Sequence, residues 1–367
     1  MSTLNRSLAA ACLLSLSGVA QADVVTEWND VYLQLIRWTG GPPGPISRRA
    51  PMMNLAVYDA VNSIDRVEDF ASSHKPYLDS VPVPAAGTSR EAAAAAAAYT
   101  VLSNMFPMMS DENPQIGVLI QSTYDNQLAL IAAGPAKANG VAHGEAIGYQ
   151  MLLHRFLDGS DPVPAYVPGG NAGDWRPSPD GPNMPGFNPQ WGTVTPWGLE
   201  SGSQFRPTTL TVFGGMANLL ASPEYAAQLN GGPGVLGVKE LGERNSPTRT
   251  ADETEAAWFW ANDRDGTYKP PGHLIYITRV VSQDQGLTLS QNARLFGLVS
   301  IGLGDAGISA WDCKYDTDID LWRPIDAIRE TQDDGNPLTT PDPAWLPLND
   351  FTPPFPAYVS GHATFGA

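Results

Sequence analysis

The sequence is poor in cysteine, with only Cys12 and Cys313 among its 367 residues. Cys12 lies in a leader that resembles a secretory signal: Arg6 is its charged residue, Leu8 to Val19 are apolar, and Ala20-Gln21-Ala22 is a small-x-small cleavage site. Cleavage near Ala22 would leave Cys313 alone and exclude an internal disulfide. We therefore expect a periplasmic or secreted protein stabilised by its core, with a buried first helix as the alternative interpretation of the leader.

Basic residues and long apolar runs are also scarce. The chain has 21 Lys and Arg against 38 Asp and Glu, a formal net charge of −17 at pH 7. Such a surface repels nucleic acid and anionic lipid, so we expect neither as a partner. The leader is shorter than the roughly 20 apolar residues that span a bilayer, and we expect no other segment to be long and apolar enough for a membrane span. Against this acidic background, a local cluster of Lys and Arg would mark an anion site.

Helical periodicity dominates the rest of the chain and predicts an all-α fold. Residues 1–22 are the predicted signal peptide, and residues 23–159 form a predicted N-terminal helical part. A further helix is expected from about Ala136 to Phe156. The predicted helix starts are Thr26, Ser47, a capping box of Thr88 with Glu91 ahead of the alanine run 92–98, and Asp111.

Residues 160–247 change character to Pro, Gly, Asn and Trp with little periodicity. Only Ser222-Pro223-Glu224 resembles a helix start, with proline at the first helical position. Structureless stretches of this length are usually functional loops, lids or linkers. We expect a long irregular excursion that its tryptophans pack over the helices, rather than a separate domain.

Helical patterns resume in residues 248–367. Thr250 and Glu253 make a second capping box, and a long helix is predicted from about Leu289 to Trp311. Three small residues in that helix, which would let a neighbouring helix approach closely, are Gly302, Gly304 and Gly307.

The last part of the sequence concentrates groups suited to a tetrahedral oxyanion such as phosphate or vanadate. Lys314 would supply a point charge, and Arg323 would supply a planar fork of donors. In the turn Ser360-Gly361-His362, glycine lets backbone N–H approach an oxygen, and the histidine exchanges protons near neutral pH. His273, which follows Pro-Pro-Gly, is interpreted instead as a loop histidine with satisfied hydrogen bonds.

Two segments resemble the signatures of the vanadium-dependent haloperoxidases, which are related to type-2 phosphatidic acid phosphatases and bacterial acid phosphatases. The first signature runs from Asp305 to Lys314 and continues through Leu321-Trp322-Arg323-Pro324, and the second runs from Pro353 to Gly366. Softer similarity covers residues 28–30, 41–47, 58–62 and 250–263. The resemblance implies helical bundles with vanadate as cofactor, which phosphate can replace.

The resemblance also implies roles for single residues. Lys314 and Arg323 would bind equatorial oxygens of vanadate. Ser360 and the N–H of Gly361 would donate hydrogen bonds to it. His362 would be the catalytic acid–base residue that helps peroxide to bind and to lose a proton.

Three further residues match supporting positions of the family. Trp311 and Phe355 lie where some members keep the aromatic residues of the halide site. Asp263 matches an aspartate that orients an arginine of the pocket. The axial histidine that ligates vanadium has no counterpart in this chain, so no metal ligand is assigned.

The sequence departs from the family pattern in three places. Eight residues separate Lys314 from Arg323, more than in the family, and a nine-residue step on one helix would turn the side chain by about 180°. We therefore expect either a bulge near residues 316–318 or a lysine on a loop before the helix; if neither holds, Lys314 is not a ligand. Val359 replaces the usual proline before Ser360. No Ser-Arg pair with a later histidine follows His362 within these residues, so residues 1–367 alone are expected to be inactive or nearly so.

The implied reaction is oxidation of a halide by hydrogen peroxide, followed by halogenation of a small organic acceptor. A homodimer is one candidate assembly. A phosphomonoesterase in which His362 protonates the leaving group is an alternative, and a non-catalytic oxyanion-binding protein is a third. The aromatic pair Trp311 and Phe355 and the long helical N-terminal part favour the peroxidase.

Overall fold

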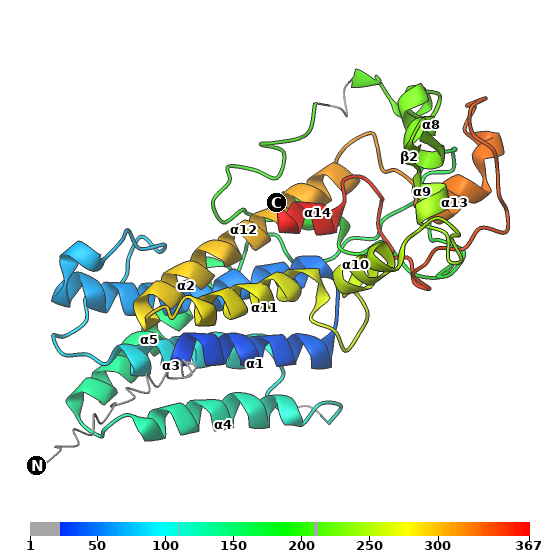
Figure 1. Ribbon diagram of the computed structural model, residues 1–367. Helices are drawn as coiled ribbons and strands as arrows, with labels where there is room; N and C mark the ends of the chain where they lie inside the picture. Colours follow the sequence, from blue (N-terminus) through cyan, green and yellow to red (C-terminus); the bar gives the residue numbers. More distant parts are fainter. Residues whose placement is uncertain (1–22, 110, 209–211) are drawn as a thin grey trace, which may run out of the picture.

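The protein is built from helices, as the computed structural model shows for residues 23–109, 111–208 and 212–367 (Figure 1). The predicted signal peptide lies outside these described residues. The α-helices are α1 (Val24–Thr39), α2 (Pro43–Glu68), α3 (Arg90–Met105), α4 (Gln115–Leu130), α5 (Pro135–His154), α7 (Met216–Leu220), α8 (Pro223–Asn230), α9 (Val238–Leu241), α10 (Ala251–Ala261), α11 (Lys269–Asp284), α12 (Leu289–Tyr315), α13 (Pro324–Arg329) and α14 (Gly361–Gly366). The 3-10 turns are η1 (Phe70–Ser72), η2 (Pro189–Thr193) and η3 (Thr331–Asp333).

Strand content is minimal among the described residues, and the all-α prediction is confirmed. The strands β1 (Gly231–Gly232) and β2 (Val235–Leu236) pair antiparallel, with Gly231 opposite Leu236. Helices α1 to α5, α11 and α12 form the main bundle, while α8, α9 and α13 gather at the other end of the molecule (Figure 1).

Helix α3 lies at the centre of the bundle, packed between α2 and α5. All seven alanines of the run 92–98 are fully buried. Helix α5 presents glycines to α3 at every fourth position, because a Cβ on Gly140, Gly144 or Gly148 would come within 2.2–2.8 Å of α3 or its cap. Small residues on both helices therefore allow their backbones to approach, and high helix propensity keeps the alanine run helical.

Several predicted helix starts were wrong by one to five residues. Asp23 rather than Thr26 caps α1, and its carboxylate accepts a hydrogen bond from the Thr26 N–H at 2.9 Å. Ser89 rather than Thr88 caps α3. Helices α2 and α4 start at Pro43 and Gln115 without a side-chain cap, in place of the predicted Ser47 and Asp111.

Other starts were confirmed. Ser222 caps α8, and Thr250 with Glu253 forms the complete capping box of α10. Helix α12 begins at Leu289 as predicted but runs four residues past Trp311. Of its glycines, Gly304 packs against Trp197 and Gly307 against Ser47 of α2, whereas a Cβ on Gly302 would meet open space. Close contact with a neighbouring residue therefore explains why glycine stands at positions 304 and 307, but not at position 302.

Helix α12 also corrects an expectation about membranes. Its length and mean hydropathy of 1.2 would allow a span, so the expectation that no internal segment is long and apolar enough was wrong on composition alone. More than half of the apolar window is buried inside the protein. The helix also carries Asp305, Asp312 and Lys314, all buried, which suits the core helix of a bundle.

The irregular stretch 160–247 is held against α12 by two carboxylates. Asp305 accepts hydrogen bonds from the backbone N–H groups of residues 197, 198 and 199 at 2.7, 2.8 and 3.1 Å. Asp312 accepts two from Arg206 at 2.6 and 2.8 Å. Trp175, Trp191 and Trp197 of this stretch are buried.

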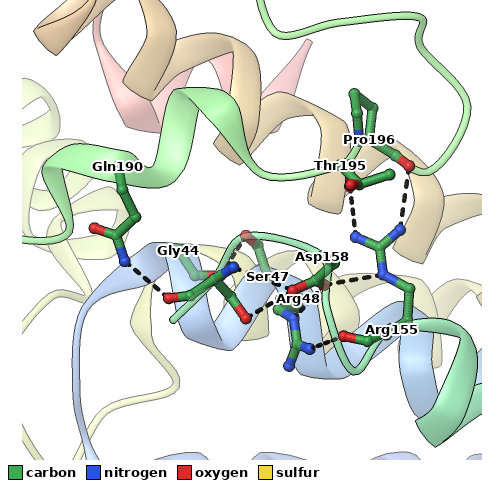
Figure 2. A network of polar contacts seen from close by, with 9 residues as sticks. Gly44, Ser47, Arg48, Arg155, Asp158, Gln190, Thr195 and Pro196 are labelled. Carbon is green, nitrogen blue, oxygen red and sulfur yellow. Dashed lines mark hydrogen bonds and ion pairs between the residues drawn. The ribbon is translucent and has the colours of Figure 1, made fainter. Parts of the chain in front are cut away.

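A buried ionic network holds the same stretch to the end of α5 (Figure 2). Asp158 accepts hydrogen bonds from Arg48 at 2.7 Å and from Arg155 at 3.0 Å. Arg155 also donates to the carbonyl oxygens of Thr195 and Pro196, and its guanidinium lies 3.9 Å from the ring centroid of Trp197. Burial opposes the charge on Asp158, but the two arginines outweigh it and hold the pKa of this carboxyl below its usual value.

Candidate functional site

A cavity of about 760 Å³ lies where α10, the end of α12, the start of α13 and the segment 345–362 meet. Its wall brings together nearly all the residues that the sequence singled out. They are Asp263, Lys314, Arg323, Phe355, Ser360, Gly361 and His362.

Lys314 lies in the last turn of α12 and is fully buried. Its ammonium donates hydrogen bonds to the carbonyl oxygens of Pro356 at 2.6 Å, Ala357 at 3.4 Å and Val359. Burial, reinforced by the charge of Arg323, places the pKa of Lys314 well below its usual range. Besides lining the cavity, the lysine thus fastens the turn that carries Ser360, Gly361 and His362.

The long spacing between Lys314 and Arg323 has a different explanation from the two that were predicted. Helix α12 ends at Tyr315, and Arg323 is the residue immediately before α13, so the two side chains do not share a helix. The connecting loop is fixed by backbone hydrogen bonds of 2.7 Å from Trp175 to Asp320 and from Trp322 to Gly173. The predicted bulge and the predicted loop lysine were both wrong, yet both cations reach the cavity.

Arg323 brings an unpaired donor to the cavity. Its Nε is buried and has no hydrogen-bond partner among the described residues. Its guanidinium lies 5.4 Å from the ring centroid of Phe355. Burial lowers the pKa of Arg323, while the charges of Asp263 and Asp326 act in the opposite direction. Within the described part of the chain neither Arg323 nor Lys314 forms a salt bridge.

The hydrogen bond of His362 defines its tautomer. Nε2 lies 3.0 Å from the carbonyl oxygen of Ala261 at the end of α10. Because a carbonyl oxygen only accepts, Nε2 must carry the proton and donate. Nδ1 is then the ring atom that can take up or release a proton.

Ser360 is the N-cap of α14 and is exposed. Its Oγ accepts a hydrogen bond from the Ala363 N–H at 3.3 Å, which leaves the hydroxyl hydrogen free to be donated. Gly361 follows as the first residue of α14.

Asp263 also lines the cavity, where its pKa is raised. Burial is the main cause, and the charges of His362, Lys269 and Arg323 oppose it. Because the Nε of Arg323 has no partner, Asp263 does not orient the arginine through that atom. Its role in positioning an arginine stays a prediction.

The two predicted halide-site aromatics pack together, with ring centroids 5.0 Å apart. Phe355 lines the cavity. Trp311 is fully buried, donates from Nε1 to the carbonyl of Phe187 at 2.9 Å, and is absent from the described cavity wall. The structure therefore places only Phe355 where it could contact a halide directly.

Sequence reasoning missed several residues of the cavity. His273 lies in α11 rather than in a loop, lines the cavity, and packs against Phe259 at 4.6 Å and Trp260 at 5.5 Å between ring centroids. Trp345 and Phe351 form part of the wall as well. A usable signal was the aromatic run 258–260, which is separated by one alanine from the Asn-Asp pair at 262–263.

The donor set of the cavity suits an oxyanion. Two cations without carboxylate partners, an unpaired buried N–H and a serine hydroxyl are the groups that bind four-oxygen anions. No group of three or more His, Cys, Asp and Glu that could hold a bare metal ion occurs among the described residues. Vanadate, an oxyanion, therefore fits the residues present.

Three known proteins that are similar to this chain are vanadium-dependent haloperoxidases. Residues 294–367 match the family model of the second helical-bundle domain of vanadium chloroperoxidase. The vanadium chloroperoxidase of Curvularia inaequalis is 30% identical over 395 residues, which cover 92% of this chain and 63% of that protein. The chain thus spans less than two thirds of the length of this curated relative.

Solved structures share the fold. A bacterial vanadium-dependent iodoperoxidase superposes with a TM-score of 0.69 at 20% identity, covering 93% of this chain and 77% of that one. A holo-type bacterial vanadium-dependent chloroperoxidase superposes with a TM-score of 0.60 at 15% identity, covering 95% and 80% of the two chains.

Proposed function

Because the chain carries a helical-bundle domain of the vanadium haloperoxidase type, we propose that it binds vanadate and supports the oxidation of a halide by hydrogen peroxide. One observation carries the proposal. Lys314 and Arg323 line one cavity without carboxylate partners among the described residues, and the Nε of Arg323 is buried with its hydrogen bond unmade.

Arg323 and the hydroxyl of Ser360 would donate hydrogen bonds to the anion. Lys314, whose three N–H groups are used by the carbonyls of residues 356, 357 and 359, would contribute positive charge. When bound, vanadate supplies Lewis-acid activation of peroxide without changing its oxidation state. The two cations offset negative charge on the reacting oxygens in a largely buried site, where such stabilisation is strongest.

His362 would transfer the proton of hydrogen peroxide. With Nε2 engaged by the Ala261 carbonyl, Nδ1 accepts a proton from hydrogen peroxide and later returns it to the departing oxygen. In the overall reaction the halide gives two electrons to the O–O bond of peroxide. One proton is consumed, and the products are hypohalous acid and water. Phe355 provides the apolar wall along which a weakly hydrated halide could approach.

A phosphomonoesterase is the second candidate because phosphate has the same shape and charge as vanadate. The same cations would bind the phosphoryl group, and His362 Nδ1, when protonated, would give its proton to the leaving oxygen. The proposed setting for either reaction is the periplasm or the cell exterior.

Orthovanadate binding tests the proposal first, because it reports on the anion site without requiring turnover. Calorimetry should show saturable binding of orthovanadate and weaker binding of phosphate, both lost in Arg323→Gln. Absence of saturable binding in the folded protein would refute the site.

A side-by-side assay then separates the two reactions. Bromination of a dye with vanadate and peroxide is compared with hydrolysis of p-nitrophenyl phosphate without vanadate, each with His362→Ala as the control. Bromination that depends on vanadate and on His362 supports the peroxidase. Phosphate release inhibited by vanadate supports the phosphatase instead.

A further inference from the structure

We propose that the outer part of the cavity binds a neutral aromatic acceptor, of the phenol type, and holds it over the oxyanion-binding residues for halogenation. This inference rests on the proposed function. It names the class of organic substrate and makes that substrate a bound ligand rather than a diffusing target.

Helix α10 forms one wall of the cavity and carries three large aromatic side chains that are not buried. None of its residues is buried, and Trp258, Phe259 and Trp260 are 47%, 53% and 49% exposed. Exposed clusters of large apolar side chains mark binding surfaces. Trp258 and Phe259 line the same cavity as Lys314 and His362. Lys314 is fully buried, so it lies deeper in the cavity than the half-exposed Trp258 and Phe259 near the mouth.

The aromatic wall is held in place although it is not packed into the core. The capping box fixes the start of α10, and Arg249 just before it donates to the carbonyls of Leu241 and Glu243 at 2.6 Å each. At the other end, the Ala261 carbonyl accepts the hydrogen bond from His362. A site built on a fixed element needs no ordering when a ligand binds, which favours affinity.

Another part of the wall comes from the segment 345–353, in which Trp345, Leu348 and Phe351 line the cavity. Trp345 donates from Nε1 to the Lys239 carbonyl at 2.7 Å, so its one polar atom is already satisfied. Backbone hydrogen bonds of 2.8 Å from Leu348 to Gly242 and from Arg244 to Leu346 tie this segment to the stretch before α10. The segment 345–353 and the stretch that leads into α10 are therefore held together by hydrogen bonds.

Charge at the mouth favours a neutral ligand. The two arginines of the outer wall are occupied, Arg249 by backbone carbonyls and Arg264 by an ion pair with Asp350. The net charge of −17 repels organic anions from the surface. The volume of about 760 Å³ falls in the range of sites for small organic molecules, which are lined mainly by apolar and aromatic side chains.

An electron-rich ring suits the proposed chemistry. In hypohalous acid the halogen is formally at +1, and it accepts an electron pair from a ring carbon as the O–X bond breaks and a C–X bond forms. The ring then loses the proton from that carbon, and the proton joins the departing hydroxide as water. The ring carbon is oxidised by two electrons, and the halogen is reduced to −1.

Equilibrium binding to the whole chain tests the inference without turnover. The probes are 2-naphthol, which is uncharged at pH 7, and 2-naphthoate, which has the same ring system with a carboxylate. Calorimetry should show saturable binding of 2-naphthol, with weaker binding of 2-naphthoate. Trp258→Ala should weaken 2-naphthol binding by about threefold to tenfold, and Trp258→Phe should restore most of it.

The control is Phe205→Ala, which removes an aromatic ring that is 71% exposed and lies outside the cavity wall. Its affinity for 2-naphthol should equal that of the unmodified chain. Equal affinity in Trp258→Ala, no saturable binding of 2-naphthol, or tighter binding of 2-naphthoate would each overturn the inference. Orthovanadate binding is measured on the same samples. If vanadate binds and 2-naphthol does not, the inference of an acceptor site is wrong, whereas the proposed function is still supported.

Discussion

The ammonium of Lys314 donates a hydrogen bond of 2.6 Å to the carbonyl oxygen of Pro356, so the end of α12 holds the turn that leads to His362. This contact joins the two signature segments, which are about forty residues apart in the sequence. The lysine therefore has a positioning role, whatever charge it contributes to anion binding.

Replacing Lys314 by methionine should lower orthovanadate affinity by at least about tenfold, because it removes both a cation and the hydrogen bonds to the 356–359 carbonyls. Calorimetry gives the affinity, and circular dichroism checks the fold. Lys75→Met, at an exposed lysine, is the matched control and should bind like the unmodified chain. Unchanged affinity in Lys314→Met would mean that the lysine acts on neither the anion nor the turn.

Arg323→Lys should weaken phosphate and vanadate binding by about tenfold although the charge is kept, because an ammonium lacks the planar fork of donors. Arg323→Gln should weaken it further. Titrations at two salt concentrations separate charge from geometry. Arg294→Lys, on the exposed face of α12, controls for loss of a guanidinium. If Arg323→Lys bound as well as the unmodified chain, point charge alone would explain recognition.

Gly144→Ala and Gly302→Ala should change stability in opposite directions. A Cβ on Gly144 would lie 2.2 Å from the Ala93 carbonyl oxygen, so α5 and α3 must separate, at a cost of about 1–3 kcal/mol. Gly302 has open space, so alanine there should stabilise α12 by up to about 1 kcal/mol. Urea denaturation measures both. Equal effects would contradict the close packing of α3 on α5.

Two buried carboxyls should add to stability as the pH falls from 7 to 5, against His143 and His273, whose pKa values burial lowers and which act in the opposite direction. Burial raises the pKa of Asp59 and of Asp326 to about 6, against the hydrogen bonds that each accepts. The folded protein thus holds protons that the unfolded chain has released, so the contribution of these two carboxyls to the free energy of unfolding increases as the pH falls through 6 and levels off near 4.

Asp326→Asn tests the assignment, because the amide mimics the protonated carboxyl. The variant should show a shallower dependence of the free energy of unfolding on pH, measured by urea denaturation at pH 7, 6 and 5. Asp79→Asn, at an exposed position, should retain the full dependence. Parallel curves for all three proteins would show that Asp326 does not titrate in this window.

Helix content could be read from the sequence because it depends on local patterns, and the anion-binding part of the cavity could be read from the two signature segments, whereas wall residues such as His273, Trp345 and Phe351 were missed. The alanine run with high propensity becomes α3, and Thr250 with Glu253 caps α10 as the pattern indicates. Helix α11 was missed because it begins with Lys269-Pro270-Pro271-Gly272 and has no capping side chain. Its first turn is stabilised by packing, which a local pattern does not record.

Spatial relations inside the cavity were harder to foresee. The spacing of Lys314 and Arg323 predicted a bulge or a lysine on a loop, whereas α12 ends at Tyr315 and a loop held by backbone hydrogen bonds to residues 173 and 175 leads to Arg323. The hydrogen bond between His362 and Ala261 joins residues 101 positions apart, and only the tertiary structure sets it. The place of Trp311 behind Phe355 depends in the same way on its bond to Phe187.

The carboxylate of Asp305, which receives three consecutive backbone amides from residues 197–199, has a consequence for motion. Those amides should exchange their hydrogens with solvent as slowly as the core of α12, although they belong to a segment without regular structure. Deleting part of residues 160–247 would then not shorten a surface loop. It would expose the helix whose last turn carries Lys314 into the cavity.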